Sequence, residues 1–248
     1  MDESPEGCRY CGRNPLTREH ALASQLAALI PSPQSMTSER VTVGAQGAEI
    51  LSSWSAANAA QVVVREFCEG CNGGWMNDLD TAVKPSFAEM VIGNTVHLER
   101  IEARIWATWV VKQFLSYQAS YPDDLSSPDE YRLFYSTRKP LDGQQVYLGI
   151  GTSLPWVHLH GRRPLWATTN GGERKCVLQL WTAVYGQLVV QIVAPQSASL
   201  RIPNRAVDGK MSVLWPIADS HVQPGGRGRL SKDEVAELTM LQPLLELS

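Results

Sequence analysis

Two Cys-x-x-Cys pairs constrain the fold of this chain more than any other feature. Cys8 and Cys11 form the first pair, and Cys68 and Cys71 form the second, with 56 residues between the pairs. The turn inside each pair aims both sulfurs at one point, and two such pairs complete the tetrahedral four-sulfur site of a structural zinc ion. We therefore expect Zn²⁺ to hold two distant segments of the chain together.

Two other uses of these cysteines fit the sequence less well. A catalytic zinc needs an open coordination position and usually a histidine or carboxylate ligand, whereas all-sulfur sites are mostly closed. Redox-active Cys-x-x-Cys pairs occur singly, near a strand–helix–strand pattern, and here two pairs match each other. The fifth cysteine, Cys176, stands alone in an apolar run, where a buried and inert thiol is expected.

Composition is that of an ordinary globular protein. The 248 residues are 44% hydrophobic and 19% charged, enough for one large domain or two small ones. The first residues are acidic and lack the apolar run of a secretory signal, and no stretch approaches the roughly 20 apolar residues of a membrane span. Paired cysteines in such a chain favour metal binding in a reducing compartment. We therefore expect a cytoplasmic protein with no membrane partner.

The charge distribution gives little bulk attraction for nucleic acid. Residues 1–95 hold 6 basic and 11 acidic side chains, net −5, and the remainder holds 16 and 14, net +2. Any contact with nucleic acid must therefore be local, or come from the second part of the chain. Arginine and lysine pairs at 162–163, 174–175 and 227–229 are candidates there, although scattered solvent-facing cations are the ordinary explanation.

Hydrophobic periodicity and turn residues predict an α+β chain in two parts. In residues 1–95 we expect strands at 16–20 and 61–67, helices at 21–30 and 72–90 with Pro85 bending or ending the second, and a long loop over 32–60 that carries a strand at 40–43. In residues 96–248 we expect a long helix at 98–117, then strands at 131–135, 145–150, 156–159, 177–184, 188–193 and 212–215, and a capped helix after Ser231.

Glu19, His20 and Asn72 are the side chains best suited to chemistry. An imidazole beside a carboxylate suits metal-assisted hydrolysis of a phosphodiester, because it can take the proton of an attacking water while the carboxylate holds a divalent ion. Asn72, directly after the second pair, offers an amide oxygen, a hard ligand suited to Mg²⁺ or Mn²⁺. Taken singly, His20 is more simply a surface or half-buried imidazole and Asn72 a helix cap. His158 and His160 share a strand face without a third ligand nearby, which favours an exposed strand face over a metal site.

The joint placement of these residues resembles the HNH endonucleases. The residues that carry the resemblance are Cys8-Arg9-Tyr10-Cys11-Gly12 with Leu16-Thr17-Arg18-Glu19-His20, and Cys71-Asn72-Gly73-Gly74-Trp75-Met76 with Leu79. Over roughly residues 8–90 the chain is similar to a group of small HNH-type proteins of bacteria and their phages.

The resemblance implies a ββα-metal module braced by the four-cysteine zinc. It implies His20 as the general base, and Glu19 and Asn72 as ligands of a single catalytic Mg²⁺ or Mn²⁺ ion. The middle Asn of the motif, which braces the loop, falls on Asn58, the only Asn between His20 and Cys68. The chain departs from the family pattern in its final Asn in place of His, in a longer gap before the second pair, and in the lack of a basic surface on the first part.

The sequence thus predicts an N-terminal ββα-metal (HNH) module over 1–95, braced by a four-cysteine zinc site, and a long helix with a mostly antiparallel β domain over 96–248. The predicted function is metal-dependent endonucleolytic cleavage of nucleic acid, with DNA as the favoured substrate. The alternative is a catalytically inactive zinc-binding module that interacts with nucleic acid or protein. DNA versus RNA, sequence preference and oligomeric state, including a homodimer, are left open.

Overall fold

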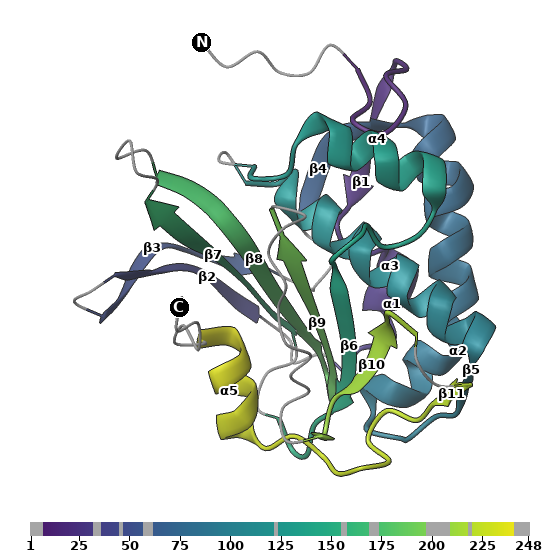
Figure 1. The fold of residues 1–248 in the computed structure, drawn as a ribbon, viewed down its shortest axis with the longest axis vertical. Helices are drawn as coiled ribbons and strands as arrows, with labels where there is room; N and C mark the ends of the chain where they lie inside the picture. The colour runs from purple at the N-terminus through teal and green to yellow at the C-terminus, as the bar shows by residue number, and fades with distance from the viewer. Residues whose placement is uncertain are drawn as a thin grey trace.

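A computed structural model describes residues 7–31, 36–44, 47–56, 62–121, 124–154, 158–168, 174–196, 209–217 and 220–240 of the chain. Within 36–56, 158–168, 174–175 and 239–240 it describes the backbone alone. Helices and strands are both abundant (Figure 1), so the predicted α+β class is confirmed at that level.

An antiparallel five-stranded sheet forms the centre of the molecule (Figure 1). Its strands, in the spatial order β10-β6-β9-β8-β7, are β6 (Gln145–Ile150), β7 (His158–Thr168), β8 (Arg174–Tyr185), β9 (Leu188–Pro195) and β10 (Ser212–Trp215). The β8–β9 hairpin turns at Gly186, where a Cβ would lie 2.3 Å from the Val91 carbonyl oxygen. Glycine is therefore required for the hairpin tip to approach the Val91 backbone so closely.

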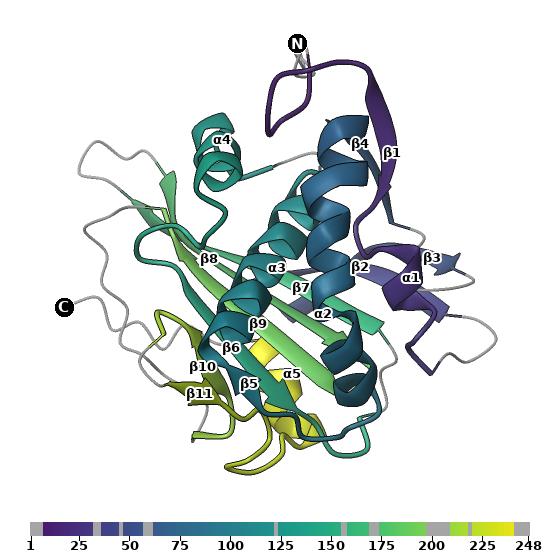
Figure 2. The ribbon, with the colours of Figure 1, turned by 90° about the vertical axis from the view of Figure 1, so that its right-hand side faces the viewer.

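Both faces of this sheet are covered (Figure 2). Helices α2 (Asn77–Val91) and α3 (Arg100–Gln118) cross one face, and α5 (Lys232–Met240) packs on the other. Side chains alternate accordingly: Val190 and Ile192 of β9 join the main core beneath α3, whereas Val189 and Val193 join a second core with α5.

Helix α3 is the predicted long helix, and it is buried almost all round. It begins with a capping box, in which the Glu99 backbone N–H donates to the Glu102 carboxylate at 2.9 Å. Every residue from 106 to 118 is buried. A helix with no solvent face must lie between two layers, and α3 lies between the sheet and the N-terminal elements.

The N-terminal elements that carry the paired cysteines are two paired strands followed by a helix. Strand β1 (Leu16–His20) pairs antiparallel with β4 (Val63–Cys68). From β4 the chain passes through η2 (Cys71–Met76), a short helical turn kinked at Gly74, into α2. Pro85 lies inside α2, and the helix continues beyond it to Val91.

The predicted strand at 131–135 is wrong, because these residues belong to helix α4 (Pro128–Thr137). Its start is a capping box: the Glu130 backbone N–H donates to the Ser127 hydroxyl at 3.2 Å, and the Ser127 N–H donates to the Glu130 carboxylate at 2.7 Å. Pro128 at the first helical position adds to this signal. These start signals outweigh the strand preference of the aromatic residues that follow.

The predicted long loop over 32–60 is also wrong where the structure describes it. Strands β2 (Met36–Gly44) and β3 (Gly47–Ala56) pair antiparallel there, and the expected strand at 40–43 lies inside β2. Serine and glycine in this segment obscure the alternation of apolar and polar residues that indicates a strand. The two strands are stabilised by pairing with each other. Helix α1 (Ser24–Ala27) is shorter than predicted, and a short pair joins β5 (Leu98–Glu99) to β11 (His221–Val222).

The proposed division at residue 95 falls between α2 and β5 and stays a prediction. Residues from both sides of it share one apolar core, which includes Tyr10 and Phe67 as well as Trp106 and Val190. Among the described residues, no helix combines the length and apolarity that crossing a membrane would need.

Candidate metal centre

The four paired cysteines converge on one point. Their Sγ atoms all lie within 4.8 Å of one another, with Cys11–Cys68 at 3.4 Å and Cys11–Cys71 at 3.6 Å. These separations exclude disulfides, whose sulfurs are about 2.05 Å apart. Zn–S bonds of about 2.3 Å in a tetrahedron place the sulfurs about 3.8 Å apart, so the cluster is close to the size that a zinc ion needs.

Glycines shape the first knuckle, residues 7–13. The Cys8 N–H donates to the Arg13 carbonyl at 3.0 Å, and the Gly12 N–H donates to the Cys8 carbonyl at 2.7 Å. Gly12 has a φ of 74°, and a Cβ on Gly7 would lie 2.3 Å from the Gly12 carbonyl oxygen. The turn that aims Cys8 and Cys11 at the second pair therefore depends on both glycines.

The chemistry of the cluster also favours a cation. Burial raises the pKa of the Cys71 and Cys11 thiols, because thiolates in a poorly solvated site are unstable and repel one another. A soft divalent ion removes this penalty by binding the deprotonated sulfurs directly. The four cysteines can thus hold a metal ion such as zinc, as predicted.

Aromatic side chains join the first knuckle to α4. Tyr10 stacks on Phe67 with ring centroids 4.7 Å apart and meets Trp75 edge-on at 5.0 Å. The Arg138 guanidinium lies 3.8 Å from the Trp75 ring centroid and 4.1 Å from that of Tyr135. Stacked rings and cation–π contacts of this kind fix the position of the knuckle against α4.

Arg9 provides a second link between the knuckle and its surroundings. Its guanidinium donates to the Glu66 carboxylate on β4 at 2.9 Å and also pairs with Asp124, just before α4. It lies 5.2 Å from the Tyr131 ring centroid. The knuckle is therefore bonded both to its neighbouring strand and to the segment that leads into α4.

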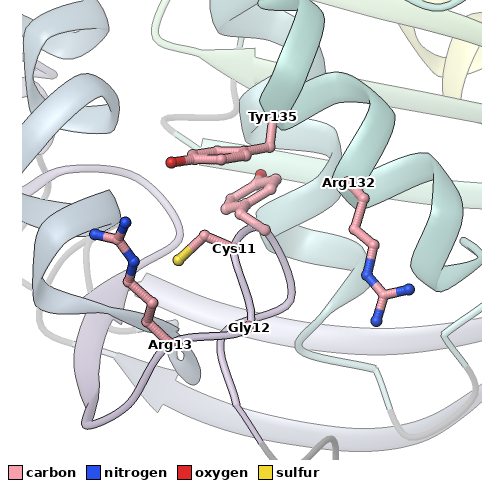
Figure 3. Close-up of a pocket in the computed structure, with 6 residues that line it drawn as sticks. Cys11, Gly12, Arg13, Arg132 and Tyr135 are labelled. Atoms are coloured by element: carbon pink, nitrogen blue, oxygen red, sulfur yellow. The ribbon is translucent and has the colours of Figure 1, made fainter.

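Cys11 is the least buried of the four cysteines. It lines an open pocket of about 440 Å³ together with Tyr10, Gly12, Arg13, Arg132 and Tyr135 (Figure 3). The other three thiols are buried. Solvent therefore reaches the cluster through the Cys11 side.

Glu19 is buried in a charged cluster beneath the β1–β4 pair. Its carboxylate lies 3.7 Å from the ammonium of Lys112, which in turn donates to both oxygens of Asp80 at 2.9 and 3.2 Å. The Trp109 indole N–H donates to the same Asp80 carboxylate at 2.8 Å. Burial raises the pKa of Glu19 to about 7, opposed by Lys112 and reinforced by the Asp80 charge.

Lys112 and Asp80 are functional candidates that motif-based reasoning missed. Lys112 lies on the predicted apolar face of α3, and a lysine among Trp109, Val110 and Phe114 signals a buried cation in need of carboxylates. Asp80 follows other polar residues after the second cysteine pair, a pattern typical of a solvated helix face, yet it is only 2% exposed.

Asn72 lies against β1. Its amide nitrogen donates to the Thr17 hydroxyl at 3.2 Å and to the Arg18 carbonyl at 3.3 Å. The first turn after the second cysteine pair is thereby fastened to the strand that carries Glu19 and His20. Because the nitrogen faces β1, the amide oxygen is the atom not used in these contacts.

His20 ends β1 and is half-buried, opposite Val63 of β4. Successive side chains of a strand point to opposite faces. Glu19 faces inward and is paired across the strands with Val64, so His20 lies on the outer face. The structure therefore brings Asn72 to the strand of both residues, but places Glu19 and His20 on opposite faces of it.

The remaining predicted site residues fall partly outside the described part of the chain. Asn58 lies there, and the side chains of His158, His160 and the cations at 162–163 and 174–175 are not described either. Arg227 and Arg229 are exposed, and Cys176 is half-buried rather than buried. Among the described side chains, the four cysteines are the only group of three or more His, Cys, Asp or Glu residues placed to hold a metal.

Comparisons of the chain with protein-family models, with curated proteins and with solved structures found no match. The assignment of a function therefore depends on the site alone.

Proposed function

We propose that this protein is a zinc-braced, metal-dependent endonuclease of the HNH type that hydrolyses phosphodiester bonds in nucleic acid, with DNA as the favoured substrate. One observation carries the proposal. The four-cysteine cluster lies at the junction of an antiparallel strand pair and the helix that follows it, with His20 at the end of the first strand and Asn72 at the start of the helical segment. This is the order of elements and residues that the resemblance to HNH endonucleases implies.

In this proposal His20 is the general base. From the outer face of the strand pair, its imidazole takes the proton of a water that attacks the scissile phosphorus. The Asn72 amide oxygen and the Glu19 carboxylate are the oxygen ligands for a catalytic Mg²⁺ or Mn²⁺ ion, which when bound would polarise the phosphate and stabilise the leaving oxygen. The contacts of Asn72 with Thr17 and Arg18 hold its side chain beside β1.

The position of Glu19 places two demands on this proposal. Its carboxylate lies on the opposite face of β1 from His20 and is paired with Lys112 at 3.7 Å, so Glu19 must both leave the ammonium and turn toward the outer face to serve as a ligand. Lys112 would keep its closer partner Asp80 throughout.

The test is nicking of supercoiled plasmid by the purified, zinc-loaded chain. Reactions contain Mg²⁺, Mn²⁺ or neither, and compare the parent with His20→Ala and with the matched control His97→Ala, whose side chain is 52% exposed away from the strand pair. We expect metal-dependent nicking by the parent and by His97→Ala, and none by His20→Ala. Nicking by His20→Ala would exclude His20 as the general base. Absence of nicking by all three proteins would exclude the nuclease function.

A second candidate function is favoured by the buried state of Glu19. A carboxylate already paired with a lysine suits a zinc-braced module that binds nucleic acid or protein without cleavage. Titration of Mn²⁺ into the zinc-loaded parent and into Asn72→Ala, followed by calorimetry, separates the two functions. The nuclease requires a second ion site that the substitution weakens, whereas the binding module requires none.

A further inference from the structure

The outer face of the β1–β4 pair carries two arginines next to His20. Residue pairs Glu19–Val64 and His20–Val63 fix the register at this end of the strands. The register shifts between Thr17 and Glu19, so Arg18 faces both Arg65 and Glu66 across the strands. Alternation from Glu19 and from Val64 places Arg18 and Arg65 on the face of His20. Both arginine side chains are exposed.

The register shift at Arg18 is a bulge. Thr17 pairs with Phe67 and Glu19 pairs with Val64, so β4 has one residue more than β1 between these pairs. The Glu66 carboxylate is bonded to Arg9 at 2.9 Å, and the carboxylate nearest the two arginines along β4 is thus already neutralised. Bulges re-aim side chains and are frequent beside functional sites.

The two guanidinium groups make no ion pair or hydrogen bond with the residues that the structure describes. Neighbouring like charges on paired strands repel one another, so the stability of the β1–β4 pair gives no reason for these two arginines. An anion bound by both cations would offset this repulsion.

We infer that Arg18 and Arg65 bind the phosphodiester backbone of nucleic acid beside His20. The inference rests on the proposed function, since it assigns the substrate contact of the same site. Guanidinium groups match phosphate oxygens in a two-pronged geometry. Arg18 lies two residues from His20 on one strand face, about 7 Å along the strand, which is close enough for both to meet neighbouring parts of one backbone.

This local pair reconciles phosphate binding with the acidic first part of the chain. Of the six cations in residues 1–95, Arg18 and Arg65 are concentrated on a single strand face, while Arg9 is neutralised by carboxylates. The Asn72 amide also holds the Arg18 backbone carbonyl at 3.3 Å. The segment that carries the catalytic candidates thus also positions one of the two phosphate ligands.

Fluorescence anisotropy with a fluorescein-labelled 30-base-pair DNA duplex tests the inference. All proteins are zinc-loaded and carry His20→Ala, so that the probe stays intact. The test variant is R18A/R65A, and the matched control is R100A/R104A, which removes two exposed arginines from α3. An RNA duplex of the same sequence shows whether the site binds the backbone of DNA or of RNA.

We expect R18A/R65A to bind the duplex at least tenfold more weakly at 50 mM salt, with the slope of log affinity against log salt reduced by about 2, one unit per lost phosphate contact. The control should bind like the parent. The thermal midpoint of R18A/R65A should equal or exceed that of the parent, because two neighbouring like charges are removed. If R18A/R65A lost binding as expected but had a lower thermal midpoint than the parent, the arginines would have a structural role and the inference would be overturned.

The remaining outcomes separate this inference from the nuclease itself. Unchanged binding by R18A/R65A, equal losses in both variants, or no binding of either duplex by the parent would each overturn the phosphate site. Arginine-dependent binding in the absence of any plasmid nicking would support the phosphate site and overturn the nuclease. Binding of the RNA duplex alone would support the site and assign RNA as its substrate.

Discussion

Lys112 carries its ammonium group into a fully buried position between carboxylates from two other elements. Asp80 approaches it from α2 at 2.9 Å, and Glu19 approaches from β1 at 3.7 Å. A buried charge is tolerated only with partners of this kind, because removal from water is costly for each ion. The cluster therefore holds β1, α2 and α3 in one arrangement and places the strand that carries His20.

Lys112→Met should destabilise the protein by about 3–5 kcal/mol, the typical loss when one member of a buried ion pair is removed and its partners remain charged. Urea unfolding followed by tryptophan fluorescence measures the change, with exposed Lys232→Met as the control. A further substitution, Asp80→Asn, should recover part of the loss. Equal free energies of unfolding for Lys112→Met and Lys232→Met would show that the contacts of Lys112 contribute no net stability.

The raised pKa of Glu19 predicts a pH dependence of stability. Burial lifts it from 4.5 to about 7, so the folded state binds a proton more tightly than the unfolded state does. Stability from this residue is then complete below the unfolded pKa and declines as pH rises through the folded pKa. Between pH 4.5 and 7 the free energy of unfolding should fall with rising pH because of Glu19.

Glu19→Gln isolates this contribution, since it keeps the shape of the protonated side chain and does not titrate. Urea unfolding of the zinc-loaded proteins, without added Mg²⁺ or Mn²⁺, should give a shallower decline for the variant between pH 5 and 7.5. Parallel curves for parent and variant would mean that Lys112 stabilises the Glu19 carboxylate at least as strongly as burial opposes it.

At the scale of elements, the turns that carry the two cysteine pairs differ in whether their glycines can be replaced. A Cβ on Gly7 would lie 2.3 Å from a backbone oxygen of the first knuckle, whereas a Cβ on Gly70, beside the second pair, meets nothing within 4 Å. Gly70 also has helical φ and ψ angles of −66° and −28°. Only the first knuckle is therefore closed by a glycine that packing makes irreplaceable.

Gly7→Ala should lower the zinc content of the purified protein, and Gly70→Ala should leave it unchanged. The backbone oxygen cannot move away like a flexible side chain, so the first knuckle must open and misplace Cys8. Zinc is measured by release to a chromogenic chelator after denaturation and is compared with protein concentration. Full zinc occupancy in Gly7→Ala would mean that the knuckle tolerates a shifted turn.

Elements with strong local signals could be predicted from the sequence, and elements defined by pairing could not. The Cys-x-x-Cys spacing, the β-branched run of β4 and the apolar face of α3 all predict what the structure contains. The β2–β3 hairpin is specified by pairing between two weakly patterned strands, and α4 by a capping box that precedes an aromatic run typical of strands. The burial of Glu19 depends on Lys112, 93 positions later, which no local pattern reveals.

At the scale of the molecule, the segments that carry the four paired cysteines are part of a larger packed unit. Tyr10 lies among rings from β4, η2 and α4, and Arg9 bridges to Asp124. The five-stranded sheet, in contrast, is packed between α3 and α5 at a distance in sequence from the cysteines. Loss of the metal should therefore affect the two regions unequally.

Removal of zinc with a chelator should increase amide hydrogen exchange first in β1, in β4 and at the start of the helical segment, and next in α4. Metal binding is a large part of the folding free energy where the local core is small, and local opening follows regions of low stability. Strands β8 and β9 should keep their protection, because they are central in the sheet and buried on both faces. Mass spectrometry of peptides after timed labelling measures the exchange.

Two cysteine substitutions provide the matched comparison. Cys71→Ser should reproduce the exchange pattern of the chelated protein without any chelator, whereas Cys176→Ser, outside the cluster, should match the zinc-loaded parent. If β8 and β9 lost protection together with β1 and β4, the metal would stabilise one cooperative unit rather than a region, because the shared core would then transmit the loss across α3. If Cys71→Ser and Cys176→Ser behaved alike, the four cysteines would hold no metal that matters to the fold.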